Sequence, residues 1–248
     1  MIEVRDVRKS FGSQAVLKGA SLQINAGEAV VIIGRSGGGK SVLLKHLIGL
    51  LPPDQGSVLV GGADLAQMTE RQLLQVRRRF GMLFQTAALF DSLNVFENVS
   101  FVLRREGNHS AAEIGSLVAD ALARVELSGI EEKLPSELSG GMRKRVGLAR
   151  AIIYKPEILL YDEPTTGLDP IAGDRIDRLI RRVWEQLNVT SIAVTHDMKS
   201  ARTISNRILM LHEGTIYADG KTEEILDSKD PILHRFVNGI SSAGIGNI

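Results

Sequence analysis

Residues 34–41 of the 248-residue chain read Gly-Arg-Ser-Gly-Gly-Gly-Lys-Ser, and this segment is the strongest indication of the fold class. It matches the phosphate-loop pattern G-x-x-x-x-G-K-[ST], and a buried-strand pattern, AVVII at 29–33, precedes it. In such loops the glycine amides surround phosphate oxygens, the lysine reaches the β- and γ-phosphates, and the serine hydroxyl binds Mg²⁺. The candidate nucleotide ligands are therefore Gly34, Arg35, Ser36, Gly37, Gly38, Gly39, Lys40 and Ser41.

The rest of the chain alternates between strand and helix patterns. Short apolar runs predict further strands at 57–60, 158–161, 191–194, 208–211 and 215–218, the last two as a hairpin. A helix expected at 171–187 lies between two of them, which is typical of βαβ units and a parallel sheet. Near the N-terminus, apolar and charged residues alternate, which predicts strands on both sides of a turn at Gly19.

A long helical region interrupts this alternation. Capping-box patterns at Thr69-x-x-Gln72 and Ser110-x-x-Glu113 mark two helix starts. The sequence therefore predicts a single domain over 1–240, with a helical subdomain at about 95–155. The Ser/Gly-rich end, 241–248, is expected to form a loose tail.

Composition and charge exclude several classes of protein. Lys and Arg number 30 against 29 Asp and Glu, so no polybasic field indicates a nucleic-acid partner. The chain has no cysteine, which excludes disulfides, thiolate metal sites and a cysteine nucleophile. Neither a signal peptide nor a run of about 18 apolar residues is present, so we expect an intracellular chain that does not itself cross a membrane.

A second motif, ILLYDE at 158–163, is an apolar strand that ends in two carboxylates. In open α/β folds ligands bind at the carboxyl ends of the strands, so these acids are expected beside the phosphate loop. Asp162 suits a contact with Mg²⁺, and Glu163 is placed to polarise an attacking water.

A third motif, LSGGM at 138–142, precedes a predicted helix. Ser139 is a good N-cap, while the helix itself does not need the glycines at positions 140 and 141. Two glycines would instead allow a ligand to approach the backbone closely. The motif thus predicts a second anion site at a helix N-terminus, formed by Ser139, Gly140 and Gly141.

Taken in order, these motifs resemble those of ABC transporter nucleotide-binding subunits. The series consists of the phosphate loop, Gln85 after a strand, residues 138–142, residues 162–163, Gly-Leu-Asp at 167–169, and His196. The resemblance covers nearly the whole chain. It implies an α/β P-loop NTPase fold, the ABC ATPase cassette, with a mainly parallel core sheet, an antiparallel β subdomain and an α-helical insertion. The implied activity is hydrolysis of ATP with Mg²⁺.

The resemblance also implies roles for single residues. Phe11 would stack on the adenine, and the alternative for this residue taken alone is an ordinary core position. Gln85 would contact Mg²⁺ and the attacking water, and His196 would hold the γ-phosphate. Two chains would close head to tail, so that the motif of Ser139, Gly140 and Gly141 of one chain would cap the ATP on Lys40 of the other. Asp169, in the D-loop at 167–169, is a further implied nucleotide-binding residue.

Two departures from the common pattern, Arg35 and Met142, occur together with the segments 85–90, 94–99, 230–232 and 236–239. In combination they resemble the cassettes of Mla-type transporters, which move phospholipids between bacterial membranes and are associated with MCE-domain proteins. The implied partners are permease subunits in the membrane, an MCE-domain protein and a small regulatory subunit. The implied location is peripheral, on the cytoplasmic face of the bacterial inner membrane.

Two further segments have open interpretations. Apolar residues from Leu83 to Phe90, with Phe101, either form a groove for a short helix of the permease or merely join the helical region to the sheet. Ile232, Leu233 and Phe236, at helical spacing, are expected to dock with the tail on the other cassette.

Other functions remain as alternatives. The cassette could serve an importer or exporter of another substrate, since its motifs do not contact the substrate. It could also be a soluble ABC ATPase, such as one of iron–sulfur assembly, or a nucleotide-binding regulatory module. The pair Asp162 and Glu163 argues against a module that binds without hydrolysis.

Overall fold

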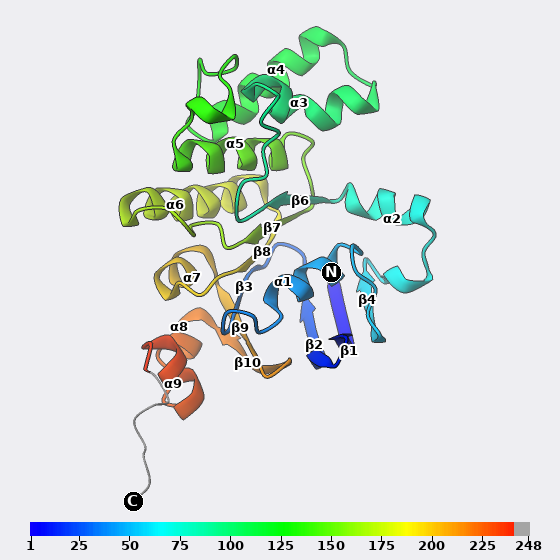
Figure 1. Cartoon of the computed structure of the whole chain (residues 1–248), viewed down its shortest axis with the longest axis vertical. Helices are drawn as coiled ribbons and strands as arrows, with labels where there is room; N and C mark the ends of the chain where they lie inside the picture. The colour runs from blue at the N-terminus through cyan, green and yellow to red at the C-terminus, as the bar shows by residue number, and fades with distance from the viewer. Residues whose placement is uncertain (241–248) are drawn as a thin grey trace, which may run out of the picture.

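The computed structural model describes residues 1–240, which form two β-sheets with helices around them (Figure 1). The expected tail, 241–248, lies outside the described residues. The six-stranded sheet has the order β10-β9-β3-β8-β7-β6, and β10 is its one antiparallel strand. Its strands are β3 (Ala29–Ile33), β6 (Phe80–Leu83), β7 (Ile158–Asp162), β8 (Thr190–Val194), β9 (Arg207–His212) and β10 (Thr215–Lys221). The α/β fold with a mainly parallel core sheet is confirmed.

The core sheet is buried on both faces, as its apolar runs predict. All five residues of β3 and of β8 are buried. On one side the sheet packs on α1 (Lys40–Leu47) and the four-stranded sheet. On the other it packs on α5 (Gly140–Ile152), α6 (Pro170–Leu187) and α7 (Met198–Ile204). The carboxyl ends of the parallel strands therefore meet along one edge.

The four-stranded sheet is antiparallel and has the order β2-β1-β4-β5. Its strands are β1 (Ile2–Phe11), β2 (Gln14–Ile24), β4 (Gln55–Val60) and β5 (Ala63–Asp64). The turn expected at Gly19 is wrong, because the chain reverses at residues 12–13 and Gly19 lies inside β2. Gly19 has φ +112° opposite an irregular stretch of β1, and a Cβ there would lie 2.6 Å from Oδ1 of Asp6. The glycine allows this close approach within a strand.

Helices α3 (Val95–Glu106), α4 (Ala111–Arg124) and α5 lie together at one end of the molecule, and residues 222–237 lie at the other (Figure 1). The capping boxes at Ser110 and at Thr69, which opens α2 (Glu70–Arg77), are both present. Short 3-10 turns occupy Leu65–Gln67 and Pro135–Glu137. No helix of residues 1–240 is long and apolar enough to cross a membrane.

Two short helices at the other end, α8 (Thr222–Leu226) and α9 (Pro231–Val237), follow the hairpin β9–β10. The helical spacing at 232–236 is confirmed as α9. Leu233 is buried in the core of its own chain, however, and Ile232 and Phe236 pack against that core. The expectation that all three side chains dock on another cassette is therefore wrong for Leu233.

Candidate active site

A cleft of about 470 Å³ opens at the carboxyl edge of the core sheet. It brings together residues from β1, the phosphate loop, and the segments after β6, β7 and β8, which are far apart in the sequence. The lining residues are Phe11, Gln14, Val16, Ser36, Gly37, Gly39, Lys40, Ser41, Val42, Gln85, Glu163 and His196. Most of the site residues predicted from the sequence thus line one cleft. The sequence did not predict Gln14, Val16 and Val42, because apolar and neutral residues at these positions form no distinctive motif.

The phosphate loop is a tight backbone cradle around Lys40. This lysine is only 6% exposed, and its Nζ donates to the carbonyl oxygens of Gly34 (2.8 Å) and Arg35 (3.0 Å). Burial lowers the pKa of Lys40, and the carboxylates of Glu163 and Asp162 oppose that shift. A Cβ on Gly39 would lie 2.9 Å from Cγ1 of Val16, so this glycine keeps the cradle open. The loop therefore presents backbone groups and one cation, which suits a polyphosphate.

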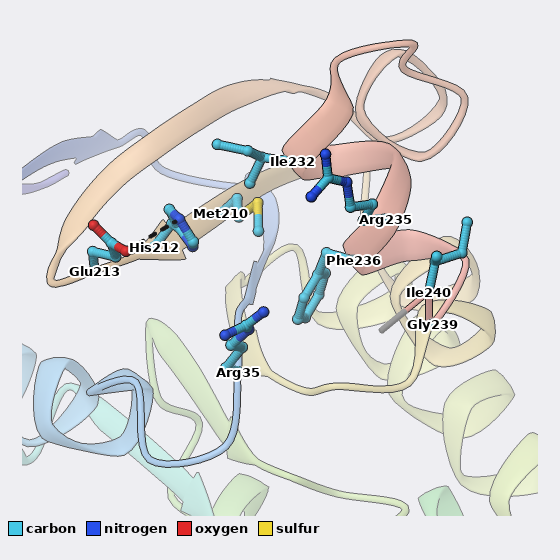
Figure 2. A pocket seen from close by; sticks show the side chains of 9 residues that line it. All are labelled: Arg35, Met210, His212, Glu213, Ile232, Arg235, Phe236, Gly239 and Ile240. Atoms are coloured by element: carbon cyan, nitrogen blue, oxygen red, sulfur yellow. Dashed lines mark ion pairs between the residues drawn. The ribbon is translucent and has the colours of Figure 1, made fainter. Parts of the chain in front are cut away.

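The side chain of Arg35 lies outside the cleft. It lines a separate cavity of about 420 Å³, where Arg35 and Phe236 point toward each other (Figure 2). The other lining residues are Met210, His212, Glu213, Ile232, Arg235, Gly239 and Ile240. Arg35 thus contributes its backbone to the loop, and the structure does not place its guanidinium at the phosphates.

An oxygen-rich corner lies where α1 meets β7. The hydroxyl of Ser41 donates to Oδ1 of Asp162 at 3.0 Å. Hydroxyl and carboxylate oxygens are the ligands that Mg²⁺ prefers, and Mg²⁺ is often held by one or two carboxylates together with substrate phosphates. The residues present at this corner therefore fit Mg²⁺.

Glu163 and His196 also line the cleft, and they contact each other. Nδ1 of His196 lies 2.9 Å from Oε2 of Glu163, and the hydroxyl of Thr166 donates to the same carboxylate oxygen at 3.2 Å. Glu163 has φ +48°, a left-handed backbone that is uncommon for residues other than glycine. Its amide donates to the carbonyl of Val194 in the adjacent strand, which holds this turn in place. A strained residue that its neighbours hold firmly is typical of functional sites.

Phe11 lies at the mouth of the cleft. Its side chain is 49% exposed, and Nζ of Lys9 lies 5.8 Å from the ring centroid. An ordinary core position is therefore excluded for Phe11. An exposed aromatic ring beside a phosphate cradle can stack on a nucleobase, because stacking buries its apolar face.

The third motif lies on a different surface. Ser139 caps α5, and its Oγ accepts from the amide of Met142 at 3.2 Å. Asp169 caps α6 by accepting from the amides of Ile171 and Ala172, both at 3.0 Å. A Cβ on Gly140 would lie 3.2 Å from Cδ2 of Leu168, so the two helix starts are neighbours.

These helix starts are absent from the lining of the cleft in the same chain. Gly140 and Gly141 are half-buried, and the side chain of Ser139 is exposed. Ser139, Gly140, Gly141 and Asp169 thus form a second surface with helix N-termini. Such a surface can bind an anion that another molecule brings to it.

Lys144, on α5, is a residue that the sequence did not single out. It is 4% exposed, and its Nζ donates to the backbone oxygens of Gln85 and of Glu163 (3.3 Å to the latter). Burial lowers its pKa to about 8, against the carboxylates of Asp162 and Glu163. No signal in the sequence could have found it, since a lysine one turn into a helix is usually exposed.

Comparisons with known proteins agree with this geometry. Residues 17–166 match the family model described as ABC transporter. The chain is 43% identical to the probable ribonucleotide transport ATP-binding protein mkl of Mycobacterium leprae, over 99% of the chain and 71% of that protein. It is 38% identical to the intermembrane phospholipid transport system ATP-binding protein MlaF of Haemophilus influenzae, over 99% of the chain and 93% of that protein.

The fold is also similar to that of solved cassettes. The dimeric post-hydrolysis structure of the ATP-binding cassette MJ0796, bound to ADP and Pi, superimposes with a TM-score of 0.81 at 32% identity. The match covers 90% of this chain and 99% of that one.

Proposed function

Because the chain belongs to the ABC transporter family, as one of its ATP-hydrolysing cassettes, we propose that it energises phospholipid transport through a separate permease. The observation that carries the enzymatic part is the single cleft that Lys40, Gln85, Glu163 and His196 share. The substrate assignment rests on the similarity to MlaF along nearly the full length of both chains.

The residues that the sequence predicts at the site have proposed tasks in holding MgATP. Phe11 stacks on the adenine, while Lys40 and the loop amides of residues 34–39 bind the β- and γ-phosphates. Ser41, Asp162 and the side chain of Gln85 would hold Mg²⁺, which, when bound, neutralises charge that develops on the phosphates. The bond between Ser41 and Asp162 supports this proposal, because it already gathers two oxygen ligands at one point.

Hydrolysis then needs a positioned water and a stabilised phosphate. Glu163 polarises the water, whose oxygen attacks the γ-phosphorus as the bond to the β-phosphate oxygen breaks, giving ADP and phosphate. His196 holds the γ-phosphate, and Gln85 orients the water. The contact between His196 and Glu163 supports these roles, since it places both side chains on the same wall of the cleft.

A second copy of the chain completes the proposed site. The helix starts at Ser139, Gly140 and Gly141, together with Asp169, are expected to cap the nucleotide of the partner, because none of them lines the cleft of its own chain. The dimeric state of the similar cassette MJ0796 supports this arrangement. Each nucleotide would then be bound between two chains.

The permease is expected to dock at a groove of about 770 Å³ beside α2 and α3. Phe101 lines this groove, and its ring centroid lies 4.7 Å from that of Phe90, which is 44% exposed. Phe101 is half-buried, so the pair presents one exposed aromatic ring at the edge of the groove, which suits an apolar helix face of a membrane partner. An MCE-domain protein and a small regulatory subunit are the further proposed partners, at the cytoplasmic face of the bacterial inner membrane.

A second candidate substrate class is ribonucleotides, which the name of the mycobacterial relative suggests. An experiment can distinguish phospholipid from ribonucleotide transport. The protein is extracted with its partners in mild detergent and reconstituted into vesicles, and ATP hydrolysis is then measured. Recovery of an MCE-domain protein and stimulation by phospholipid would support the proposal. Stimulation by ribonucleotides alone, or recovery of purely soluble partners, would refute it.

A further inference from the structure

The loop that contains Gln85 is held by one face of α5. Three residues at a spacing of three, Lys144, Gly147 and Arg150, face this loop. Lys144 donates to the carbonyl of Gln85. Arg150 donates to the carbonyls of Ala87 (2.8 Å) and Ala88 (2.7 Å).

Helix α5 packs closely against this loop and the strand before it. A Cβ on Gly147 would lie 2.9 Å from Cδ1 of Leu83, so the helix can approach only because position 147 is a glycine. Ala87 and Ala88 have φ +63° and +47°, two consecutive left-handed residues that lack the freedom of glycine. A backbone of this kind persists when its surroundings fix it. The bonds from α5 supply that constraint.

Lys144 also reaches a second catalytic segment. Strands β6 and β7 are parallel neighbours, and Leu83 pairs with Tyr161. Gln85 and Glu163 each lie two residues beyond that pair, so their backbones leave the sheet side by side. Nζ of Lys144 donates to both of their carbonyl oxygens.

We propose that Lys144 is a positioning residue for ATP hydrolysis: it fixes the backbone of Gln85 against that of Glu163 and ties both to α5. The proposal rests on the proposed roles of Gln85 and Glu163. Since α5 begins at the glycines that are expected to meet the nucleotide of the partner, Lys144 also connects that helix start to the chemistry of its own chain. A shift of α5 then moves the groups that orient the water.

Arg145 provides a matched control on the same helix. Its Nη1 donates to the carbonyl of Glu126 at 3.0 Å, away from the cleft. Lys144→Met and Arg145→Met both remove a cation that donates hydrogen bonds to backbone oxygens. Only the side chain of Lys144 bonds to the segments that contain Gln85 and Glu163. In the full-length protein we expect Lys144→Met to lower kcat about tenfold or more, because small misplacements of catalytic groups are costly. Arg145→Met should stay within about twofold of the wild type.

Binding must be separated from turnover. The dissociation constant for ATP without Mg²⁺, measured with a fluorescent ATP analogue, should change by less than about twofold in Lys144→Met, since Lys144 bonds to no residue of the phosphate loop. The melting temperatures of the two variants should be similar. An unchanged kcat in Lys144→Met would overturn the proposal. So would a parallel loss of ATP affinity, or a melting temperature far below that of Arg145→Met, because either would give Lys144 a purely structural role.

Glu163→Gln distinguishes this proposal from the roles on which it rests. If Glu163→Gln hydrolyses ATP at the wild-type rate, the assignment of Glu163 fails, whatever Lys144→Met does. If Glu163→Gln is slow and Lys144→Met is fast, only the positioning role of Lys144 is refuted.

Discussion

The imidazole of His196 is directly paired with the carboxylate of Glu163, Nδ1 to Oε2 at 2.9 Å. The pair comes from the ends of adjacent parallel strands, β8 and β7, so the sheet itself sets its geometry. A γ-phosphate held by His196 would therefore lie next to the group proposed to polarise the water. The pair makes Glu163 the first residue to test.

Glu163→Gln keeps the shape of the side chain and removes its ability to polarise water. We expect kcat for ATP hydrolysis to fall about a hundredfold or more, with MgATP binding retained. The variant should remain a closed dimer in MgATP, visible by size-exclusion chromatography. Near-normal turnover, or failure to dimerise with MgATP, would count against the proposed site.

Head-to-tail closure can be tested by mixing two inactive variants. Lys40→Ala removes the buried cation of the cradle, and Ser139→Glu places a negative charge at the helix start expected to meet phosphate. Each variant alone should be inactive in an ATPase assay. A mixture should recover up to about a quarter of wild-type activity, since a mixed dimer contains one intact composite site. If cleft and helix start acted within one chain, mixing would restore nothing.

Phe90→Asp should prevent docking of the permease at the groove beside α2 and α3. The charge is placed on an exposed ring that stacks on Phe101, so the fold and ATP binding should persist. Leu50→Asp, at another exposed apolar side chain, is the control. Affinity purification from detergent extracts would measure the recovered permease, and normal recovery with Phe90→Asp would refute the groove assignment.

Stability is expected to depend on pH through Asp177. This residue of α6 is 3% exposed; Oδ2 accepts from Ser200 at 2.7 Å, and Oδ1 has no hydrogen-bond partner in the described part of the chain. Burial raises the pKa of Asp177 to about 6, which the hydrogen bond from Ser200 opposes, while the nearby carboxylates of Asp197 and Asp174 add to the rise. Its unfolded value is near 3.8.

Between these two values the folded chain retains a proton that the unfolded chain has lost. The free energy of unfolding contributed by Asp177 therefore decreases as the pH rises from about 4 to about 6, by on the order of 3 kcal/mol. Asp177→Asn has no carboxyl group to titrate at this position, so its stability relative to the wild type should increase between about pH 4 and pH 6. Urea unfolding at pH 4.5 and 7 measures the difference, with the exposed Asp120→Asn as control; an equal pH dependence in Asp177→Asn and the wild type would contradict the assignment.

Two deletions test whether the chain beyond α9 supports the dimer. Removal of 241–248 should weaken MgATP-dependent dimerisation of the Glu163→Gln protein and leave the melting temperature unchanged. Removal of 229–248 should also lower the melting temperature, because it takes Leu233 out of the core. If dimerisation in MgATP is unchanged after removal of 241–248, the expectation that the tail contacts the other cassette is wrong.

Local sequence patterns were enough to predict the fold class and most residues of the cleft. Gly39, Lys40 and Ser41 stand at fixed spacing after a buried strand, and Asp162 and Glu163 end another, so local patterns alone located both. Phosphate binding depends on contiguous backbone amides, which is why a short motif is enough to reveal it. The capping boxes at Thr69 and Ser110 were equally local.

Tertiary packing, in contrast, set the contacts between distant segments. It directed the side chain of Arg35 into another cavity, moved the predicted turn from Gly19 to residues 12–13, and buried Lys144 beneath Gln85 and Glu163. In each case the outcome depends on what packs against the residue from elsewhere in the chain: α9, the irregular pairing of β1, and the neighbouring ends of β6 and β7. Periodicity and spacing describe a residue's neighbours along the chain, and they do not specify which distant backbone a side chain will meet.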